Sequence, residues 1–425
     1  MLRYRRRQAL HDGIRLAAAL TLAAGCVPPG GVRTLTVAEL YVGLARERAV
    51  AVLDSITDRV ISRISLSPLG RQGLPWQIGV GPTGNAAVLP LVANAPEVGV
   101  IRPAGAAGGD APSVPITGSP SRRNLPAGAR LAPLGAADGC CERVRVGTGA
   151  SLPHRYGAGE SAQHLTADAR GRAYVLVVDP AGLEPSTVAV LDLATGTILR
   201  HLPVAQAGEQ VLALEVLPDG SRLYASVWRS DWLGRPGWGP GAGRIVALDP
   251  AQGRLLAQTS LPDGNGAMHL AVAPALGAGH APTLYGALST PSFWDDGWGW
   301  ALPRPPLLVA MDALQLDPLS VWSLEERPAA LAVHPEGRHA YLLMGQPLAG
   351  TSSRRLVCLD LGAGVVTQRW PLPGGCLALA MGPVDKLYVA DTLGDRLWRV
   401  DTRSNTLLAP IALQGAPLAL AARPA

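Results

Sequence analysis

The sequence predicts an all-β fold: a single closed β-propeller, in which four-stranded sheets repeat around a ring. Three observations support this prediction. The segment from Thr187 to Trp228 reads as one complete four-strand unit. Its strand elements recur along the chain at spacings of about 40 to 60 residues, the size of one propeller blade. The C-terminal residues match the strand that the first unit lacks.

The reference unit shows why these residues form strands and turns. VAVLD ends at Asp192 and is followed by the turn ATG, in which Gly196 accepts a positive φ without a Cβ clash. TILRHLPV is a second run, and VLALEVLP alternates at period 2. The turn at Gly220 then leads into LYASVW. Such a unit has two apolar faces and cannot bury them alone, so it predicts copies of itself.

The copies are visible as two short elements. The VLD element recurs with its last residue at Asp54, Asp249, Asp312, Asp360 and Asp401, and EVGVIRP, ending at Pro103, is a degenerate copy. The LY element recurs at Leu40–Val42, Ala173–Val178, Leu284–Leu288, Ala340–Gly345 and Leu387–Asp391. Together these elements predict seven blades. Eight blades remain an alternative, because the stretch from Arg102 to Asp192 spans about two repeat lengths.

The two ends of the chain complement each other. The first blade begins at LTVAELYVGLARERAVAVLD and has no inner strand of its own. APLALAARP, from Ala416 to Pro424, matches the inner strands AALAVHP and LALAMGP, and nothing follows it to complete another blade. We therefore expect the C-terminal strand to join the N-terminal blade and close the ring without an open sheet edge.

These repeats resemble the bacterial YVTN-type β-propeller repeat proteins, whose units read approximately VxVxDxxTGxVxxxIxxxxxPxxLAVxPDGxxLYV. The resemblance covers about Leu35 to Pro424. It implies the propeller fold, but it does not imply one function, because this fold carries many unrelated activities.

Blade two is the least regular part of the repeat. It covers about Trp76 to Thr117, and Pro90 interrupts one of its apolar runs, which should disturb a central strand. Residues 118–160 contain no clean unit, so we expect a long irregular insertion there. Blades four and five carry insertions between their second and third strands, at Arg229–Ala242 and Ser289–Pro305.

The N-terminus predicts export. Residues 1–25 combine a basic start with a ten-residue apolar run, Leu16–Gly25, which is too short to span a bilayer and is typical of a signal peptide. Ala-Gly before Cys26 resembles the lipobox of bacterial lipoproteins, although Ala23 stands where that motif favours leucine. The resemblance implies a lipid on Cys26 that holds the protein at the membrane outside the cytoplasm. We expect a Pro/Gly tether over 26–34 and the propeller over 35–425. A plain exported protein, cleaved nearby, is the alternative.

Composition limits the function classes. The chain has 425 residues, of which 48% are hydrophobic and 16% charged, enough for a large core. The net charge is +5, but the arginines are scattered rather than clustered with aromatic residues, which argues against nucleic acid binding. We expect a monomer. Four cysteines lie beyond Cys26, namely Cys140, Cys141, Cys358 and Cys376, and both disulfides and buried thiols remain open.

A first candidate ligand site lies on the inserted loops of blades four and five. Second-to-third-strand loops share a face with the blade-to-blade connections, which we call the connection face. Six of the ten tryptophans and the only phenylalanine fall in or beside these insertions. The candidate ligand-binding residues are Trp232, Trp238, Trp294, Trp298, Trp300, Asp295 and Asp296. Aromatic residues on glycine-rich loops suit a protein, glycan or small-molecule ligand. They can equally fold back as a small core for their own loops.

A second candidate site lies on the inner strands. Five places before each turn proline or its equivalent, most blades carry alanine, but blades two, three and five carry Gln77, His164 and His269. Glu215 of blade four stands three places before its turn proline. We expect these four polar side chains in the axial channel. Two histidines and a carboxylate suit metal binding or proton transfer, and a hydrogen-bonded, water-filled channel is the structural alternative.

No strong catalytic motif is present, and no cofactor is identified. The repeated aspartates at the ends of the VLD elements precede turns, so we expect them to accept backbone N–H bonds rather than act in catalysis. The sequence therefore favours a lipid-anchored, extracytoplasmic binding or scaffold module. The alternative is a propeller enzyme, lactonase-like or dehydrogenase-like by fold analogy, with its site at the mouth of the axial channel. A purely structural envelope protein is a third possibility.

Overall fold

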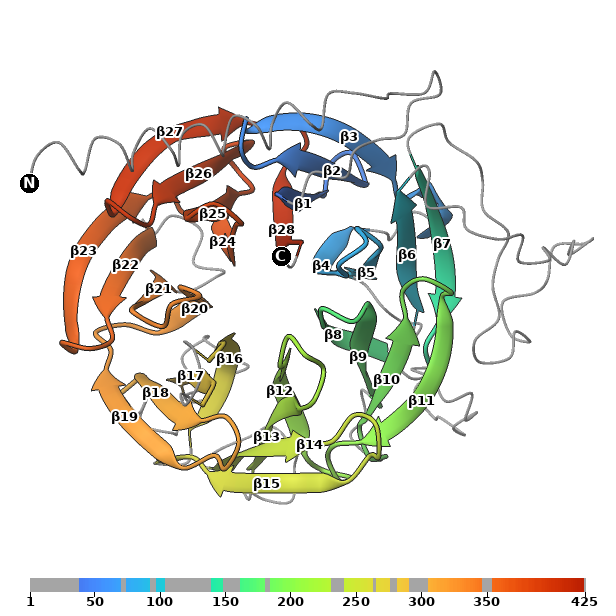
Figure 1. Cartoon of the computed structure of the whole chain (residues 1–425), viewed down its shortest axis with the longest axis vertical. Helices are drawn as coiled ribbons and strands as arrows, with labels where there is room; N and C mark the ends of the chain where they lie inside the picture. Colours follow the sequence, from blue (N-terminus) through green and yellow to red (C-terminus); the bar gives the residue numbers. More distant parts are fainter. Residues whose placement is uncertain are drawn as a thin grey trace, which may run out of the picture. The chain divides into compact units, whose positions relative to one another are not determined.

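Seven four-stranded antiparallel sheets follow one another around a common axis in the computed structural model (Figure 1). The structure describes residues 38–69, 74–91, 97–103, 139–147, 161–179, 184–230, 241–262, 265–275, 281–289, 305–345 and 354–423. They belong to one compact unit, Val37–Ala425. The chain is thus a seven-bladed β-propeller, as its repeats predict.

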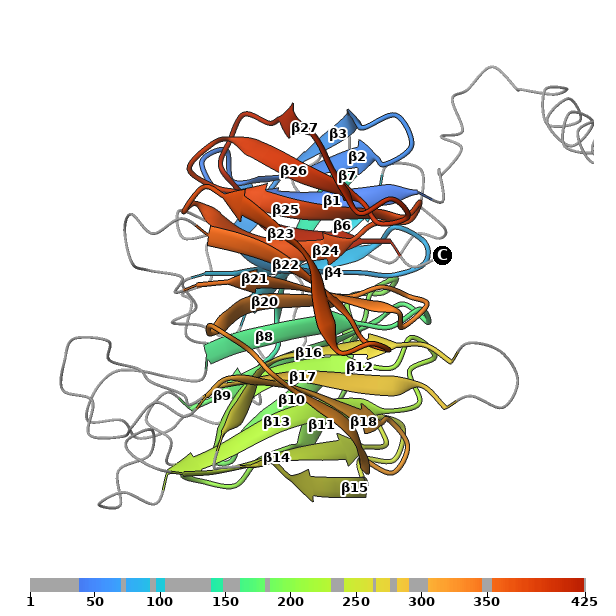
Figure 2. The same cartoon turned by 90° about the vertical axis from the view of Figure 1, so that its left-hand side faces the viewer.

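Each blade contributes one strand to four concentric positions, seen face-on in Figure 1 and from the side in Figure 2. The innermost strands are β28 (Pro417–Ala422), β4 (Pro75–Val80), β8 (Ser161–Ala167), β12 (Gln210–Val216), β16 (Gly266–Ala273), β20 (Pro328–Val333) and β24 (Cys376–Met381). The second strands are β1 (Glu39–Leu44), β5 (Ala86–Pro90), β9 (Arg172–Val178), β13 (Leu223–Ser230), β17 (Thr283–Ser289), β21 (His339–Met344) and β25 (Lys386–Asp391).

The other two positions complete the blades, which we number one to seven in the order just given. The third strands are β2 (Ala49–Asp54), β6 (Glu97–Pro103), β10 (Thr187–Asp192), β14 (Gly241–Leu248), β18 (Leu307–Asp312), β22 (Arg354–Asp360) and β26 (Arg396–Asp401). The outer strands are β3 (Arg59–Ser65), β7 (Gly139–Arg145), β11 (Thr197–Pro203), β15 (Leu255–Ser260), β19 (Pro318–Ser323), β23 (Val365–Leu372) and β27 (Thr406–Ala412). A short 3-10 helix, η2 (Ser67–Leu69), follows β3.

The ring closes as the sequence predicts. The C-terminal strand β28 pairs antiparallel with β1, and Leu40 lies opposite Ala422 while Gly43 lies opposite Ala419. Blade one therefore combines one strand from the end of the chain with three from the beginning, β28-β1-β2-β3. Figure 1 shows β28 inside β1, with blade seven on one side and blade two on the other.

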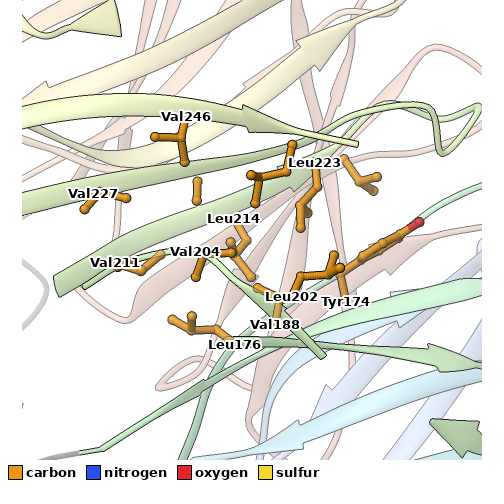
Figure 3. Packing of buried hydrophobic residues seen from close by; sticks show 14 of the residues in the cluster. Tyr174, Leu176, Val188, Leu202, Val204, Val211, Leu214, Leu223, Val227 and Val246 are labelled. Atoms are coloured by element: carbon orange, nitrogen blue, oxygen red, sulfur yellow. The ribbon is translucent and has the colours of Figure 1, made fainter. Parts of the chain in front are cut away.

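The core lies between neighbouring blades rather than in one central mass. Figure 3 shows the cluster between blades three and four, where Tyr174, Leu176 and Val188 meet Leu214, Leu223 and Val246. The second and third strands are buried almost throughout because they face a neighbouring blade on both sides, as in β9, RAYVLVV. Outer strands are mostly exposed, as in β19. The sheet-on-sheet contacts hold the inner strands at fixed positions around the axis.

A tyrosine of the LY element joins successive blades. Tyr224 of blade four donates its hydroxyl to the backbone oxygen of Ala313 in blade five, with an oxygen–oxygen distance of 2.6 Å. Tyr341 of blade six donates to the Asn405 side chain of blade seven at 2.8 Å. Tyr388 of blade seven donates to Asp58 of blade one at 3.0 Å, across the closure. Each bond satisfies a buried hydroxyl and fixes one blade against the next.

The repeated aspartates have the structural role that the sequence predicts. Oδ1 of Asp312 accepts the backbone N–H groups of Leu314 and Gln315 at 2.7 and 2.8 Å. The equivalent turns are built in the same way by Asp54, Asp192, Asp249, Asp360 and Asp401. Accepting these bonds stabilises the carboxylate form, which lowers the pKa of Asp360 and of Asp401.

Blade two differs from the prediction. Its outer strand is β7, which lies inside the segment 118–160 that the sequence alone presents as an irregular insertion. Pro103 lies opposite Gly139, so residues 104–138 separate two strands that are neighbours in the sheet. Pro90 is the last residue of β5 and therefore does not interrupt the ladder. The long separation hides β7 from a repeat search, and a terminal proline costs no ladder bond.

The cysteines are buried where they are described. Cys358 on β22 and Cys376 on β24 are free thiols in the same apolar cluster, and burial raises the pKa of Cys376 to about 12. Cys141 on β7 is also buried. The pairing of Cys140 with Cys141 lies outside the described side chains. No helix in the described ranges is long and apolar enough to cross a membrane.

Candidate functional site

Every innermost strand carries a β-bulge at the same position. In β12, Val211 pairs with Val227 and Ala213 with Ser226, so Leu212 between them has no partner in the ladder. The same irregularity occurs in the other six inner strands. The seven extra residues are Trp76, Gln163, Leu212, Met268, Ala329, Leu377 and Leu418. A bulge places two consecutive residues opposite one and re-aims their side chains.

These bulges surround an axial cavity of about 720 Å³. All seven innermost strands line it, and all seven bulged residues are in its wall. It opens on the connection face, because the other lining residues precede inner strands or flank second-to-third-strand loops, as Asp179, Glu209 and Arg327 do. Its volume is within the range of roughly 300 to 1,000 Å³ typical of small-molecule sites.

The cavity wall is polar on one side and apolar on the other. Blades two to five contribute the four polar residues that the sequence singles out, Gln77, His164, Glu215 and His269. All four are half-buried. Blades six, seven and one contribute only alanine, leucine and proline from their inner strands, apart from Arg327 just before β20. The structure therefore brings the predicted polar channel residues together in one cavity.

Gln77 links two blades at the wall. Its Oε1 accepts the backbone N–H of Leu165, in the neighbouring strand β8, at 2.7 Å. That bond fixes the orientation of the amide. Five blades further round, no side chain of this kind is available, since the equivalent position in β24 is Ala378.

The two histidines are neutral at pH 7. Burial in the channel wall disfavours the imidazolium and lowers the pKa of His164 to about 4. Burial likewise lowers the pKa of His269 to about 4, assisted by the positive charge of Arg327 and by His164. A neutral imidazole has one donor and one acceptor nitrogen, so each ring can exchange hydrogen bonds with an uncharged ligand.

The position of Glu215 in the cavity wall favours the protonated form of its carboxyl. Burial raises its pKa from 4.5 to about 8, and a backbone hydrogen bond from Val216 opposes this rise only in part. Tyr224 lies opposite it on β13, and the flanking inner strands β8 and β16 carry His164 and His269. None of these three residues supplies a cation at pH 7 to stabilise a carboxylate. The protonated acid can both donate and accept a hydrogen bond.

The mouth of the cavity carries the charges. Arg244 binds Glu209 through both guanidinium nitrogens, at 2.6 and 2.8 Å, and this bidentate pair neutralises the buried Glu209 and lowers its pKa against the effect of burial. Asp179 and Glu184 lie beside the mouth on either side of the second-to-third-strand loop of blade three. Arg327 lies at the start of β20, close enough to act on His269.

A metal centre is not evident in the described ranges. No group of three or more His, Cys, Asp or Glu side chains there is arranged to hold a metal ion, and this includes His164, Glu215 and His269.

The tryptophan-rich candidate site lies outside the described residues. Trp232, Trp238, Trp294, Trp298, Trp300, Asp295 and Asp296 fall within 231–240 and 290–300. What the structure describes is where those segments begin and end. β13 and β17 both end beside the start of their own inner strand, since Trp228 lies opposite Gln210 and Ser289 lies opposite Gly266. Both segments thus leave the blades on the face where the cavity opens.

Sequence reasoning missed several cavity residues. Strict alternation along the inner strands would place Leu212, Met268 and Leu377 between blades. The bulge turns these side chains to the channel instead. For the same reason the repeat pattern does not identify Trp76, which is 41% exposed, or Gln163 as residues of the cavity wall. The signal was present: all seven bulged residues stand six places before the turn proline or its equivalent.

Comparison with known proteins supports the fold. No family model and no curated protein matches the chain. A solved structure described as dihydro-heme d1 dehydrogenase NirN in complex with DHE is 12% identical, with a TM-score of 0.51, over 93% of this chain and 79% of that one. A functionally unknown protein from Desulfotomaculum acetoxidans DSM 771 is 10% identical, with a TM-score of 0.52, over 90% and 98% of the two chains. At these identities the likeness shows the fold alone. The resemblance to YVTN-type repeat proteins stays a prediction.

Proposed function

We propose that this chain is an extracytoplasmic propeller that binds a small organic molecule in its axial cavity. One observation carries the proposal: a cavity of about 720 Å³ into which four consecutive blades direct polar side chains while the remaining blades direct aliphatic ones. Small-molecule sites characteristically combine a mainly apolar wall with a few convergent polar groups. The same wall in a purely structural propeller would need no such division.

A neutral fluorescent dye, N-phenyl-1-naphthylamine, tests this proposal. We expect saturable fluorescence enhancement with the wild-type protein. Ala329→Trp fills the cavity from a bulged position that makes no ladder bond, so it should weaken dye binding at least tenfold. Val365→Trp, on the exposed outer strand of the same blade, is the matched control and should bind as wild type does. Equal dye binding by all three proteins would place the dye elsewhere and contradict the proposal.

The tryptophan-rich segments extend the proposal to a larger ligand. They leave the blades beside the cavity mouth, which supports a contact surface for a glycan, a protein or the outer part of a small molecule. A glycan array comparing the wild type with the Trp294→Ala/Trp298→Ala double variant tests the glycan case. Binding to the same glycans at the same strength by both proteins would argue against these residues.

A second function, catalysis at the same cavity, is favoured by the protonation states found there. Two neutral imidazoles and a carboxylic acid with a raised pKa are groups that can accept and donate protons near pH 7. A lactone panel followed by pH-indicator hydrolysis tests the lactonase-like alternative. Activity that survives in both His164→Gln and His269→Gln would exclude a catalytic role for the imidazoles.

Membrane attachment through Cys26 rests on the sequence of residues 1–34. We propose that the signal segment is removed and that Cys26 carries the lipid, which would hold the propeller at the membrane outside the cytoplasm. Cell fractionation compares the wild type with Cys26→Ala, for which we expect release from the membrane fraction. A wild-type protein that is soluble, or whose mature N-terminal peptide has no lipid mass, would contradict the proposal.

A further inference from the structure

We infer that the axial cavity binds a flat aromatic molecule with a hydrogen-bonding group at one end, and that this ligand enters polar end first. The inference rests on the proposed function and names the class of ligand. It depends on the depth at which each side chain lies in the cavity wall.

The register of the inner strands orders the wall by depth. Each inner strand begins at the connection face, where the cavity opens, and runs towards the turn that leads into its second strand. The seven bulged residues, among them Trp76 and Gln163, therefore form a collar near the mouth. Gln77, His164 and His269 each follow one residue deeper.

The cavity reaches deepest along blades three and four. In the other five blades the wall ends at a large apolar residue, such as Ile78 in blade two and Leu331 in blade six. In blades three and four it continues to Thr166 and Glu215, which are both half-buried. These two residues occupy equivalent positions on the neighbouring inner strands β8 and β12. We call Thr166 and Glu215 the floor of the cavity.

The floor requires a polar group from the ligand. The hydroxyl of Thr166 donates and accepts, and a ligand hydroxyl can bond to the carboxyl of Glu215 whether that carboxyl is ionised or protonated. An apolar group at the floor would dry both side chains without offering a hydrogen bond, which is unfavourable. Polar groups at the mouth, by contrast, stay in contact with water. The buried end of the ligand is therefore its hydrogen-bonding end.

The collar supplies an aromatic face. Trp76 is the only tryptophan, tyrosine or phenylalanine in the described wall, and it is 41% exposed. Its strand β4 lies across the axis from β16 and β20 (Figure 1), so Met268 and Ala329 are on the opposite side of the collar. The alanine leaves space in front of the indole, and a thioether packs well against a ring. A flat aromatic ring suits this gap.

Collar and floor limit the length of the ligand. Gln163 and Thr166 are three residues apart on β8, which corresponds to about 10 Å of strand. Two fused rings with a short polar arm span a similar length. Such a molecule can contact Trp76 with its rings while its polar arm reaches Thr166 and Glu215.

Three probes of one skeleton test the inference by equilibrium dialysis. 2-Naphthalenemethanol has the aromatic rings and a hydroxyl, 2-ethylnaphthalene has a methyl group in place of the hydroxyl, and decahydro-2-naphthalenemethanol carries the hydroxyl on saturated rings. We expect the wild type to bind 2-naphthalenemethanol saturably. Ala329→Trp should lose this binding, while Val365→Trp retains it.

The floor is tested with Thr166→Val/Glu215→Met. The affinity for 2-naphthalenemethanol relative to 2-ethylnaphthalene should fall about tenfold, because the hydroxyl loses its partners while the rings keep theirs. Thr406→Val/Glu336→Met changes the same residue types at exposed positions and should leave the ratio unchanged. Should the double variant not fold, Thr166→Val alone removes the hydroxyl at nearly constant volume and is read in the same way.

The collar is tested with Trp76→Leu, which keeps an apolar side chain but removes the aromatic face. The affinity for 2-naphthalenemethanol relative to its saturated analogue should fall about fivefold. Trp322→Leu, on the outer strand of blade five, is the matched control and should leave this ratio unchanged.

The outcomes separate the two proposals. A ratio that stays unchanged in the floor variant or in Trp76→Leu overturns the inference, and the proposed function still stands if Ala329→Trp removes binding. A wild type that binds N-phenyl-1-naphthylamine in the cavity but none of these probes also overturns the inference alone. If Ala329→Trp binds every probe as the wild type does, the proposed function fails and the inference fails with it.

Discussion

Replacing Glu215 by glutamine should change how the stability of the propeller depends on pH. The pKa of this carboxyl rises from 4.5 to about 8 on folding, so between these values the folded protein holds a proton that the unfolded chain has released. Each pH unit of that interval costs about 1.4 kcal/mol of unfolding free energy. The unfolding free energy is therefore undiminished by Glu215 below pH 4.5 and falls as pH rises to about 8.

The expected magnitude is large enough to measure. From pH 5.5 to 7.5 the wild type should lose about 3 kcal/mol relative to Glu215→Gln, which has no proton to take up. Urea unfolding followed by tryptophan fluorescence at several pH values gives this difference directly. Glu336→Gln, which removes a carboxylate that is 52% exposed in a turn of blade six, is the control. Parallel curves for the wild type and Glu215→Gln over this range would refute a buried, protonated Glu215.

Three further changes test other parts of the structure. Both imidazole pKa values are lowered to about 4, so the wild type should lose about 1.4 kcal/mol of unfolding free energy per pH unit and per histidine as pH falls from 6.5 towards 4. His164→Gln and His269→Gln should each remove one such loss in the same urea series. Acid sensitivity that is unchanged in both variants would count against buried rings. Tyr388→Phe should lower the free energy of unfolding by about 1 to 2 kcal/mol, because it leaves Asp58 without one of its donors across the closure; an unaltered urea midpoint would show that the bond contributes nothing. Deleting 417–425 should abolish soluble, protease-resistant protein, because β28 supplies four pairs of the ladder with β1 before its bulge. Deleting only 424–425 leaves those pairs intact and is the control. A protease-resistant 38–416 fragment would contradict closure by this strand.

The closure and the turns could be predicted because they depend on local chemistry. Ala416–Pro424 has the alternation and turn proline of an inner strand, and Asp192 and its equivalents precede turns whose N–H groups a carboxylate accepts. Strand β7 could not be predicted in this way, because residues 104–138 separate it from its partner and no repeat spacing points to it.

The candidate site could be predicted only in part. The four polar residues stood out because alanine occupies their equivalents in other blades. The bulges did not stand out, because one extra residue breaks the period of 2 by which a strand is recognised. In β12 that extra residue is Leu212, which therefore changes faces. The protonation state of Glu215 depends on walls contributed by several blades, which no single stretch of sequence contains.

The unpaired position in every inner strand separates architecture from chemistry. A side chain such as Met268 or Leu377 contributes no ladder bond, so its replacement leaves the strand pairing intact while it alters what the wall presents. Seven such positions lie around one axis, and each can change independently of the others. Mutation at these sites would therefore change the chemistry of the cavity wall without disturbing the assembly of the ring, and a combinatorial library confined to them would vary that chemistry systematically.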